Sequence, residues 1–265
     1  MLKAFGRLFL IAFCSLFFMF LVISMLRMLG TSQQYSGIEH PLLNQKKWAF
    51  AEVQNEAQVQ NLNPKVSLFL KLYLSKDTEW IVAEKNFILS AEKKVQPLNS
   101  LTAEELSGYG VLTLDKILTA SPGRPALLYI EDSSVRAFDK ITALVKKHNL
   151  AEKVLIGSNY QIVLTEVRKL EPLWLYAAST SEISKLRFFT SIFIEPLATT
   201  NSDFVVFTDE PNERLVDELH KRKKRFIYRP KDGIPNAEIS HKSDGLILKD
   251  TVILQQIVDQ APTEY

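Results

Sequence analysis

The strongest cluster of reactive side chains in this sequence is a run of cations, His220-Lys-Arg-Lys-Lys-Arg225, with Arg229 just beyond it. At the end of an amphipathic helix, such cations offset the negative end of the helix dipole while they face water. The same run could instead contact anionic lipid headgroups, where each basic residue near the surface contributes about 1 kcal/mol. Both interpretations concern one basic patch, whose members are Lys221, Arg222, Lys223, Lys224 and Arg225.

The other reactive residue types exclude several chemistries. His148 and His241 are far apart in the chain and do not have the spacing of metal ligands. Ser158 is not in a nucleophile-elbow motif, and the sequence contains no glycine-rich phosphate loop, which disfavours nucleotide-dependent chemistry. Cys14 is the single cysteine and lies in an apolar run, so the rest of the chain needs neither a disulfide nor a cysteine-based zinc site.

The N-terminal segment has the length and composition of a membrane span. Leu8 to Leu26 carry no charge, and at 1.5 Å per residue this run is roughly 28 Å long, close to the hydrocarbon thickness of a bilayer. Lys3 and Arg7 precede it, which favours an N-terminus in the cytoplasm and a translocated C-terminal body. A cleaved signal peptide is the alternative, but no clear small-x-small cleavage site follows. We expect a single-pass anchor over 1–30, a tether over 31–45 and one globular body over 46–265.

The charge of that body argues against a nucleic acid partner. The whole chain of 265 residues has a formal charge of +2, but Lys3, Arg7 and Arg27 lie in or beside the apolar segment. Without them the body carries slightly more acidic than basic residues, so it has no global attraction to nucleic acid. The sequence leaves the oligomeric state open.

Apolar runs of strand length alternate with amphipathic helical stretches through the body. The predicted strands are Trp48–Val53, Val66–Leu74, Ala126–Ile130, Val154–Ile156, Leu173–Ala177, Phe204–Phe207, Phe226–Tyr228 and Leu246–Leu248, and the clearest helices are Val135–His148, Tyr160–Leu170 and Asn212–Lys223. Strands that are apolar without alternation are typical of a sheet with both faces covered. Eight strands alternating with helices predict an α/β fold, a closed (β/α)8 TIM barrel; an open doubly wound sheet is the alternative.

Several short segments are similar, in order and spacing, to motifs of the glycerophosphodiester phosphodiesterase family. The likeness extends from about Trp48 to Asp259. Its segments are the strand and polar turn over 66–85, Thr102-Ala-Glu-Glu-Leu106, Leu112-Thr-Leu-Asp-Lys-Ile-Leu118, Leu128-Tyr-Ile-Glu131, Val154-Leu-Ile-Gly-Ser158 and Asp244-Gly-Leu-Ile-Leu-Lys-Asp250. The resemblance implies the family's barrel, a phosphoric diester hydrolase site and a role in lipid metabolism.

The same resemblance implies that this chain has lost most of the family's chemistry. Active members hold one divalent metal with three carboxylates at the barrel mouth and use two histidines. On this register the first two metal ligands become Phe69 and Lys71, whereas Glu131 retains the third, and Glu84 takes the place of a catalytic histidine. Trp48–Gln54 lacks the His-Arg-Gly triplet, although His40 could supply a histidine if 48–62 were instead the first helix. A Mg²⁺ or Ca²⁺ ion is therefore expected only if the protein is active.

The mouth pocket predicted by the resemblance comprises Phe69, Lys71, Glu131 and Tyr228. Glu131 could be a metal ligand, but an ion pair between Lys71 and Glu131 is simpler because buried charges persist when they are paired. Glu84 could act as a general base or be a solvated strand-end carboxylate. Asp77, Asp132 and Glu84 are the carboxylates that an active enzyme could recruit.

Three functions remain in competition. The favoured one is a membrane-anchored, catalytically degenerate phosphodiesterase-like barrel, a pseudoenzyme, that binds a phospholipid-derived or other anionic ligand, or a partner. The second is an active metal-dependent hydrolase of glycerophosphodiesters. The third is an envelope structural or interaction protein whose barrel mouth is filled by side chains.

Overall fold

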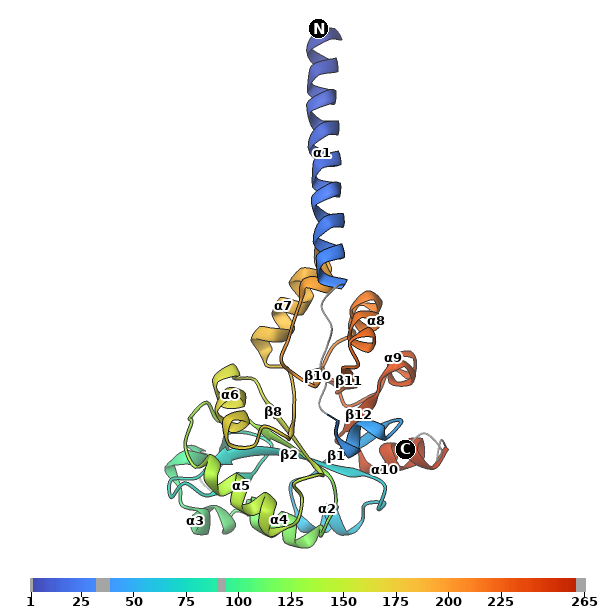
Figure 1. The fold of residues 1–265 in the computed structure, drawn as a ribbon. Coiled ribbons are helices and arrows are strands. Elements are labelled where there is room, and N and C mark those ends of the chain that lie inside the picture. The colour runs from blue at the N-terminus through green and yellow to red at the C-terminus, as the bar shows by residue number, and fades with distance from the viewer. Residues whose placement is uncertain (1, 32–38, 90–93, 261–265) are drawn as a thin grey trace.

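The computed structural model describes residues 2–31, 39–89 and 94–260. Eight parallel strands follow one another in the order β10-β11-β12-β1-β2-β7-β8-β9, and helices lie around them (Figure 1). The strands are β1 (Trp48–Glu52), β2 (Ser67–Leu74), β7 (Ala126–Ile130), β8 (Val154–Ser158), β9 (Leu175–Tyr176), β10 (Phe204–Phe207), β11 (Arg225–Tyr228) and β12 (Gly245–Leu248).

The sheet closes between its two end strands. Ala177, just after β9, bridges in parallel to Phe204 of β10. Two backbone bonds support this bridge: the amide of Ala178 donates to the carbonyl of Phe204, and that of Asp203 donates to Tyr176, both at 2.8 Å. This closure confirms the predicted α/β barrel and excludes the alternative of an open doubly wound sheet.

Helices cover the outside of the barrel. They are α2 (Glu56–Gln60), α4 (Leu114–Ala120), α5 (Phe138–Lys147), α6 (Gln161–Leu170), α7 (Thr180–Ser191), α8 (Glu213–Lys221), α9 (Ala237–Lys242) and α10 (Thr251–Gln260), with short 3-10 helices η1 (Pro41–Asn44) and η3 (Glu195–Leu197). A side unit follows β2 and contains β3 (Trp80–Val82), β4 (Phe87–Leu89), β5 (Val95–Pro97), η2 (Leu98–Ser100), α3 (Ala103–Ser107) and β6 (Leu112–Thr113).

Strand residues alternate between two apolar layers. Those facing inward form one buried cluster, which also includes Leu42 of η1 and Ala177 just after β9: Trp48, Phe50, Phe69, Leu127, Leu155, Leu175, Phe204, Ile227 and Ile247. Their neighbours face outward and pack under the helices in a larger cluster. Because both layers are shielded from solvent, the strand sequences are almost continuously apolar. The alternation decides which polar residues reach the barrel mouth.

The first strand is Trp48–Glu52, so the alternative that places 48–62 in a helix is wrong. His40 instead caps η1: its Nδ1 accepts from the amide of Leu42 at 3.2 Å. Leu42 belongs to the inner cluster beside Trp48, which begins β1. His40 therefore lies at the end of the barrel where strands begin, opposite the mouth.

The N-terminal helix α1 (Leu2–Thr31) extends away from the barrel, and α7 and α8 are the labelled helices nearest its end (Figure 1). Its segment Phe9–Gly30 is long and apolar enough to cross a membrane, a property that signal sequences share. The chain thus carries either a membrane anchor or a signal peptide at its N-terminus. Of the tether predicted over 31–45, residues 32–38 lie outside the described residues.

Candidate functional site

The mouth of the barrel, where the parallel strands end, holds a buried ion triad. Glu52 is the last residue of β1 and is 4% exposed. Its Oε1 lies 2.8 Å from Nζ of Lys71 on β2, and its Oε2 lies 2.9 Å from Nη2 of Arg229, which follows β11. Two cations thus share one carboxylate, an arrangement that keeps the buried charge compensated. The ion pair predicted between Lys71 and Glu131 is therefore wrong: the Lys71 ammonium pairs with Glu52.

Aromatic rings form the floor beneath this triad. The Arg229 guanidinium lies 4.7 Å from the centre of the Phe69 ring, and that ring lies 5.7 Å from the Tyr129 ring. Tyr129 in turn covers Gly157, because a Cβ atom at Gly157 would lie 2.4 Å from the Tyr129 ring. Only glycine fits there, so β8 leaves space for an aromatic plug. The ligand position assigned to Phe69 by the resemblance is filled by this packed ring.

Glu131 follows β7 and lies beside the triad without joining it. Its Oε2 accepts a hydrogen bond from Nδ2 of Asn159 at 3.2 Å, and Oδ1 of Asn159 accepts from the Tyr129 hydroxyl at 2.9 Å. Burial raises the pKa of Glu131, an effect that the nearby cations Lys71 and Arg229 oppose. The Glu131 carboxyl is thus held by a neutral amide in a partly desolvated place.

This pKa gives the first testable prediction. Between the unfolded and the raised folded pKa, the folded protein binds more protons, so its stability falls as pH rises through that window. Glu131→Gln is expected to remove this fall: the variant should gain stability relative to the parent at pH 7 and show no gain at pH 4. Urea unfolding of the full chain in detergent at both pH values measures it. A variant that loses stability at pH 7 would show that the ionised carboxylate is needed.

Glu84 lies at the edge of the mouth in an ion pair with Lys249, which follows β12. A hydrogen bond from Lys249 lowers the pKa of Glu84. The backbone carbonyl of Glu84 also accepts from Nζ of Lys71 at 3.5 Å. A general base working near neutrality needs a raised carboxyl pKa, so these contacts favour the strand-end carboxylate interpretation of Glu84.

Two cavities open at this end of the barrel. The first, of about 230 Å³, is lined by Glu52, Lys71, Thr208, Arg229, Pro230, Lys231, Gly233, Ile247 and Lys249. Four of these residues are cations and one is a carboxylate that the triad already uses. The second, of about 560 Å³, lies beside the side unit and includes Tyr73, Glu84, Phe87, Glu131, Asp132 and Tyr160 among its lining residues.

The donor set of the mouth does not fit a divalent metal. Mg²⁺ and Ca²⁺ require several oxygen ligands around one point, but Glu52 is neutralised by two cations and the Lys71 ammonium stands among the carboxylates. Within residues 2–31, 39–89 and 94–260, no three His, Cys, Asp or Glu side chains are grouped so that they could hold a metal ion.

The structure places the remaining predicted site residues away from the triad. Tyr228 faces the helices in the outer apolar layer, and its neighbour Arg229 reaches the mouth. Asp77 belongs to the polar turn after β2, where it accepts from Ser75 Oγ at 2.5 Å and from the amide of Ala103 at 3.0 Å. Asp132 accepts from the amide of Ser134 at 2.8 Å at the rim of the larger cavity.

Sequence reasoning missed four residues of the mouth: Glu52, Asn159, Arg229 and Lys249. Each stands at or just after the end of a barrel strand, in the inward-facing position of the alternation. This position in the sequence could have identified them as mouth residues, since polar residues at the carboxyl ends of barrel strands gather at one mouth.

The basic patch is not one surface. Lys224 is buried, where it donates to the carbonyl of Ser202 and to Oγ1 of Thr200 at 2.6 and 2.7 Å, and burial lowers its pKa to about 8. Arg225 lies over the Trp48 ring at 4.8 Å. Lys221 and Lys223 are exposed. The interpretation of the whole run as a solvated helix end is therefore wrong for Lys224 and Arg225, which support the start of β11.

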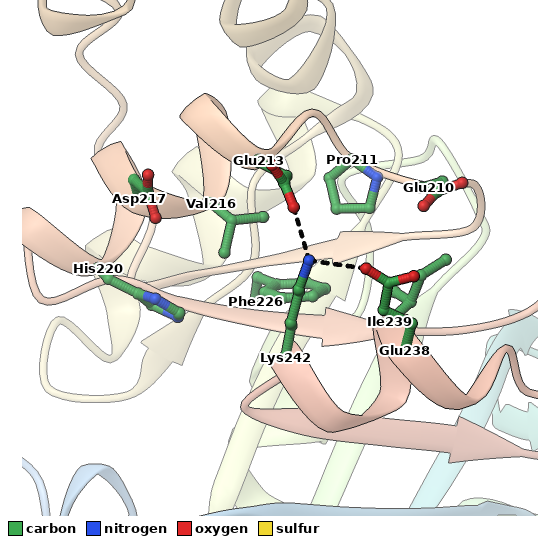
Figure 2. A pocket seen from close by; sticks show the side chains of 10 residues that line it. All are labelled: Glu210, Pro211, Glu213, Val216, Asp217, His220, Phe226, Glu238, Ile239 and Lys242. Atoms are coloured by element: carbon green, nitrogen blue, oxygen red, sulfur yellow. Dashed lines mark hydrogen bonds and ion pairs between the residues drawn. The ribbon is translucent and has the colours of Figure 1, made fainter.

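A further groove of about 360 Å³ lies between α8 and α9, on the outside of the barrel (Figure 2). Lys242 spans it and binds Glu213 at 2.6 Å and Glu238 at 3.0 Å. His220 lies at one end of the groove, where its Nε2 is 2.9 Å from Oδ2 of Asp244. Lys242 and His220 thus each have an acidic partner, while Glu210 and Asp217 are the other charged residues that line the groove.

Comparison with solved structures identifies this architecture, although no family model and no curated protein matches the sequence. The chain is similar to the glycerophosphoryl diester phosphodiesterase domain of an uncharacterized protein from Mycobacterium tuberculosis, with a TM-score of 0.64, 13% identity and coverage of 80% of this chain and 98% of that one.

Two further structures give the same picture. A putative glycerophosphodiester phosphodiesterase from Galdieria sulphuraria matches with a TM-score of 0.61 and 13% identity over 81% of this chain and 98% of its own. The glycerophosphodiester phosphodiesterase from Thermotoga maritima matches with a TM-score of 0.58 and 14% identity over 79% and 98%. The body of this chain therefore has the barrel fold found in glycerophosphodiester phosphodiesterases.

Proposed function

We propose that this protein is a membrane-anchored, glycerophosphodiester phosphodiesterase-like barrel that binds an anionic, phosphate-bearing ligand without hydrolysing it. Its N-terminus lies in the cytoplasm and its barrel on the other side of the membrane, as Lys3 and Arg7 before the apolar segment favour. The observation that carries the proposal is the ion triad. Lys71 and Arg229 compensate Glu52 where the resemblance expects a metal ion and its ligands.

The mouth has the charge and size for such a ligand. The cavity of about 230 Å³ presents Lys71, Arg229, Lys231 and Lys249, while Glu52 is its one carboxylate. Arginine and lysine donors form strong charge-assisted hydrogen bonds with phosphate oxygens. A phosphomonoester or a small phosphodiester would therefore be held by fixed cations in place of a metal.

The proposal is tested by titrating glycerol 3-phosphate and inorganic phosphate into the full chain in detergent, followed by calorimetry. Binding is expected without added divalent ions, and Lys231→Gln with Lys249→Gln should weaken it at least about tenfold, as expected for two lost charge-assisted bonds. These lysines are chosen because Lys71 and Arg229 also support the fold. Lys153→Gln is the matched control, since Lys153 precedes β8 at the opposite end of the barrel.

The same preparation separates the competing functions. Sn-glycero-3-phosphocholine should be bound and recovered intact, with or without Mg²⁺ or Ca²⁺. Chelator-sensitive release of choline would instead identify an active hydrolase that recruits metal ligands from elsewhere in the chain. If neither anion binds, the remaining function is that of an envelope structural or interaction protein whose barrel mouth is filled.

A further inference from the structure

The end of α1 is packed against the barrel at one defined place, the 3-10 helix η3. A Cβ atom on Gly30 would lie 2.5 Å from the carbonyl carbon of Pro196, so the backbones approach as closely as a glycine allows. Three residues earlier, Arg27 reaches Glu195 at 3.6 Å, and this glutamate is almost fully buried. The surface around η3 therefore lies next to any membrane that α1 crosses.

Large apolar side chains are exposed at this place. Phe188, Ile192 and Phe193 are 60%, 40% and 54% exposed, and they stand within six residues at the end of α7 and the turn before η3. We call these three residues the junction patch. Phe193 has a φ of 64°, in the left-handed region that a bulky residue rarely adopts. The Arg214 guanidinium lies 4.1 Å from the centre of its ring. The turn thus presents an aromatic ring outward in a conformation that has a backbone cost.

Cations border the junction patch. A cavity of about 280 Å³ between α1, η3 and α8 is lined by Arg27, Gly30, Glu195, Pro196, Arg214, Asp217, Glu218, Lys221 and Arg222. Glu195 pairs with Arg27, and Glu218 pairs with Arg222 at 2.7 Å. The other charged residues of the lining are Arg214, Lys221 and Asp217. The buried Nη1 of Arg214 has no hydrogen-bond partner among the described residues. The cavity therefore offers donors and a small excess of positive charge.

We propose that the junction patch rests in the interfacial layer of the bilayer that α1 crosses, with Arg214 and Lys221 at the level of anionic lipid phosphates. The proposal rests on the retained anchor of the proposed function. Apolar and aromatic side chains next to arginine and lysine are the composition that binds this layer. Each cation near an anionic membrane surface adds about 1 kcal/mol. The loss of water contact by Phe188 and Phe193 provides the apolar part of the binding.

This contact would also orient the barrel. The helices α7 and α8 run back along the barrel, so their C-terminal ends and η3 lie where the strands begin. The mouth with Lys71 and Arg229 lies at the opposite end. In Figure 1, α1 leaves the ring of helices beside α7 and α8, so a barrel seated on the junction patch turns this side of the ring toward the lipid.

The test labels single cysteines with an environment-sensitive fluorophore in the full chain carrying Cys14→Ser, inserted in nanodiscs of zwitterionic and anionic phospholipids. Phe193→Cys and Phe188→Cys report the patch. Ile234→Cys is the matched control, since Ile234 is an exposed apolar residue, 74% accessible, between β11 and α9 near the mouth. Lipids spin-labelled near the headgroup should quench positions 193 and 188 at least about twofold more than position 234, as expected for side chains in the interface.

Two results would overturn the proposal. The first is equal quenching at positions 193, 188 and 234, or no quenching at the patch positions. The second is quenching at positions 193 and 188 that is equal in zwitterionic and anionic nanodiscs and is unchanged by Lys221→Glu. That result would show that the cations do not contact lipid phosphates. Neither result affects the proposed function, because the assay contains no ligand and reports on the other end of the barrel.

Discussion

Lys71→Met is expected to lower the free energy of unfolding by about 3 kcal/mol, near the lower end of the range for breaking a buried ion pair. The change removes the ammonium that lies 2.8 Å from Oε1 of Glu52 and leaves that oxygen buried. The loss stays near the lower end because Arg229 still holds Oε2 at 2.9 Å. Chemical denaturation of the full chain in detergent, followed by tryptophan fluorescence, measures it.

Two controls accompany this variant. Lys147→Met breaks a pair of similar geometry on the surface, 2.7 Å from Asp115, and should cost less than about 1 kcal/mol because solvent screens it. Adding Glu52→Gln to Lys71→Met should recover part of the lost stability, since the uncompensated charge is then gone. If Lys71→Met costs no more than Lys147→Met, the triad is not the stabilising element of the mouth.

The second large effect is a gain of metal binding. Phe69→Glu with Lys71→Asp places two more carboxylates beside Glu52 and Glu131 and removes the ammonium. The Arg229 guanidinium lies over the Phe69 ring at 4.7 Å, so it would pair with the new carboxylate. We therefore expect weak Ca²⁺ or Mg²⁺ binding in the double variant and at least about tenfold tighter binding when Arg229→Gln is added, since one nearby cation is worth more than 1 kcal/mol in a poorly solvated site.

Calorimetry with Ca²⁺ and Mg²⁺ measures this gain, and the parent protein should give no binding heat. The matched control replaces Arg229 alone, which removes one cation without adding a carboxylate and should leave the metal unbound. Near-ultraviolet circular dichroism verifies that each variant keeps the fold. If the folded triple variant binds neither ion, the register that places Phe69 and Lys71 at ligand positions is wrong.

The fold could be predicted from local patterns. All eight barrel strands lie within one or two residues of the predicted runs, and Ala126–Ile130 and Phe204–Phe207 agree at both ends. Such runs are visible in the sequence because a strand buried on both faces must be apolar throughout. For the same reason they hide which side chains face inward. Tyr228 was therefore placed at the mouth, although its neighbour Arg229 reaches it.

The sequence by itself determined the barrel strands and the apolar N-terminal helix, because each is a property of a short segment. The replacement of two expected carboxylates by Phe69 and Lys71 stays a prediction from the resemblance. Only the tertiary structure decided which charges meet. Glu52 pairs with Lys71 and Arg229 because three strands end at one mouth. Lys224 and Arg225 belong to the basic run in the sequence, but they pack at the start of β11. Partners that are not neighbours in the sequence are set by strand register and barrel closure, and no local pattern encodes them.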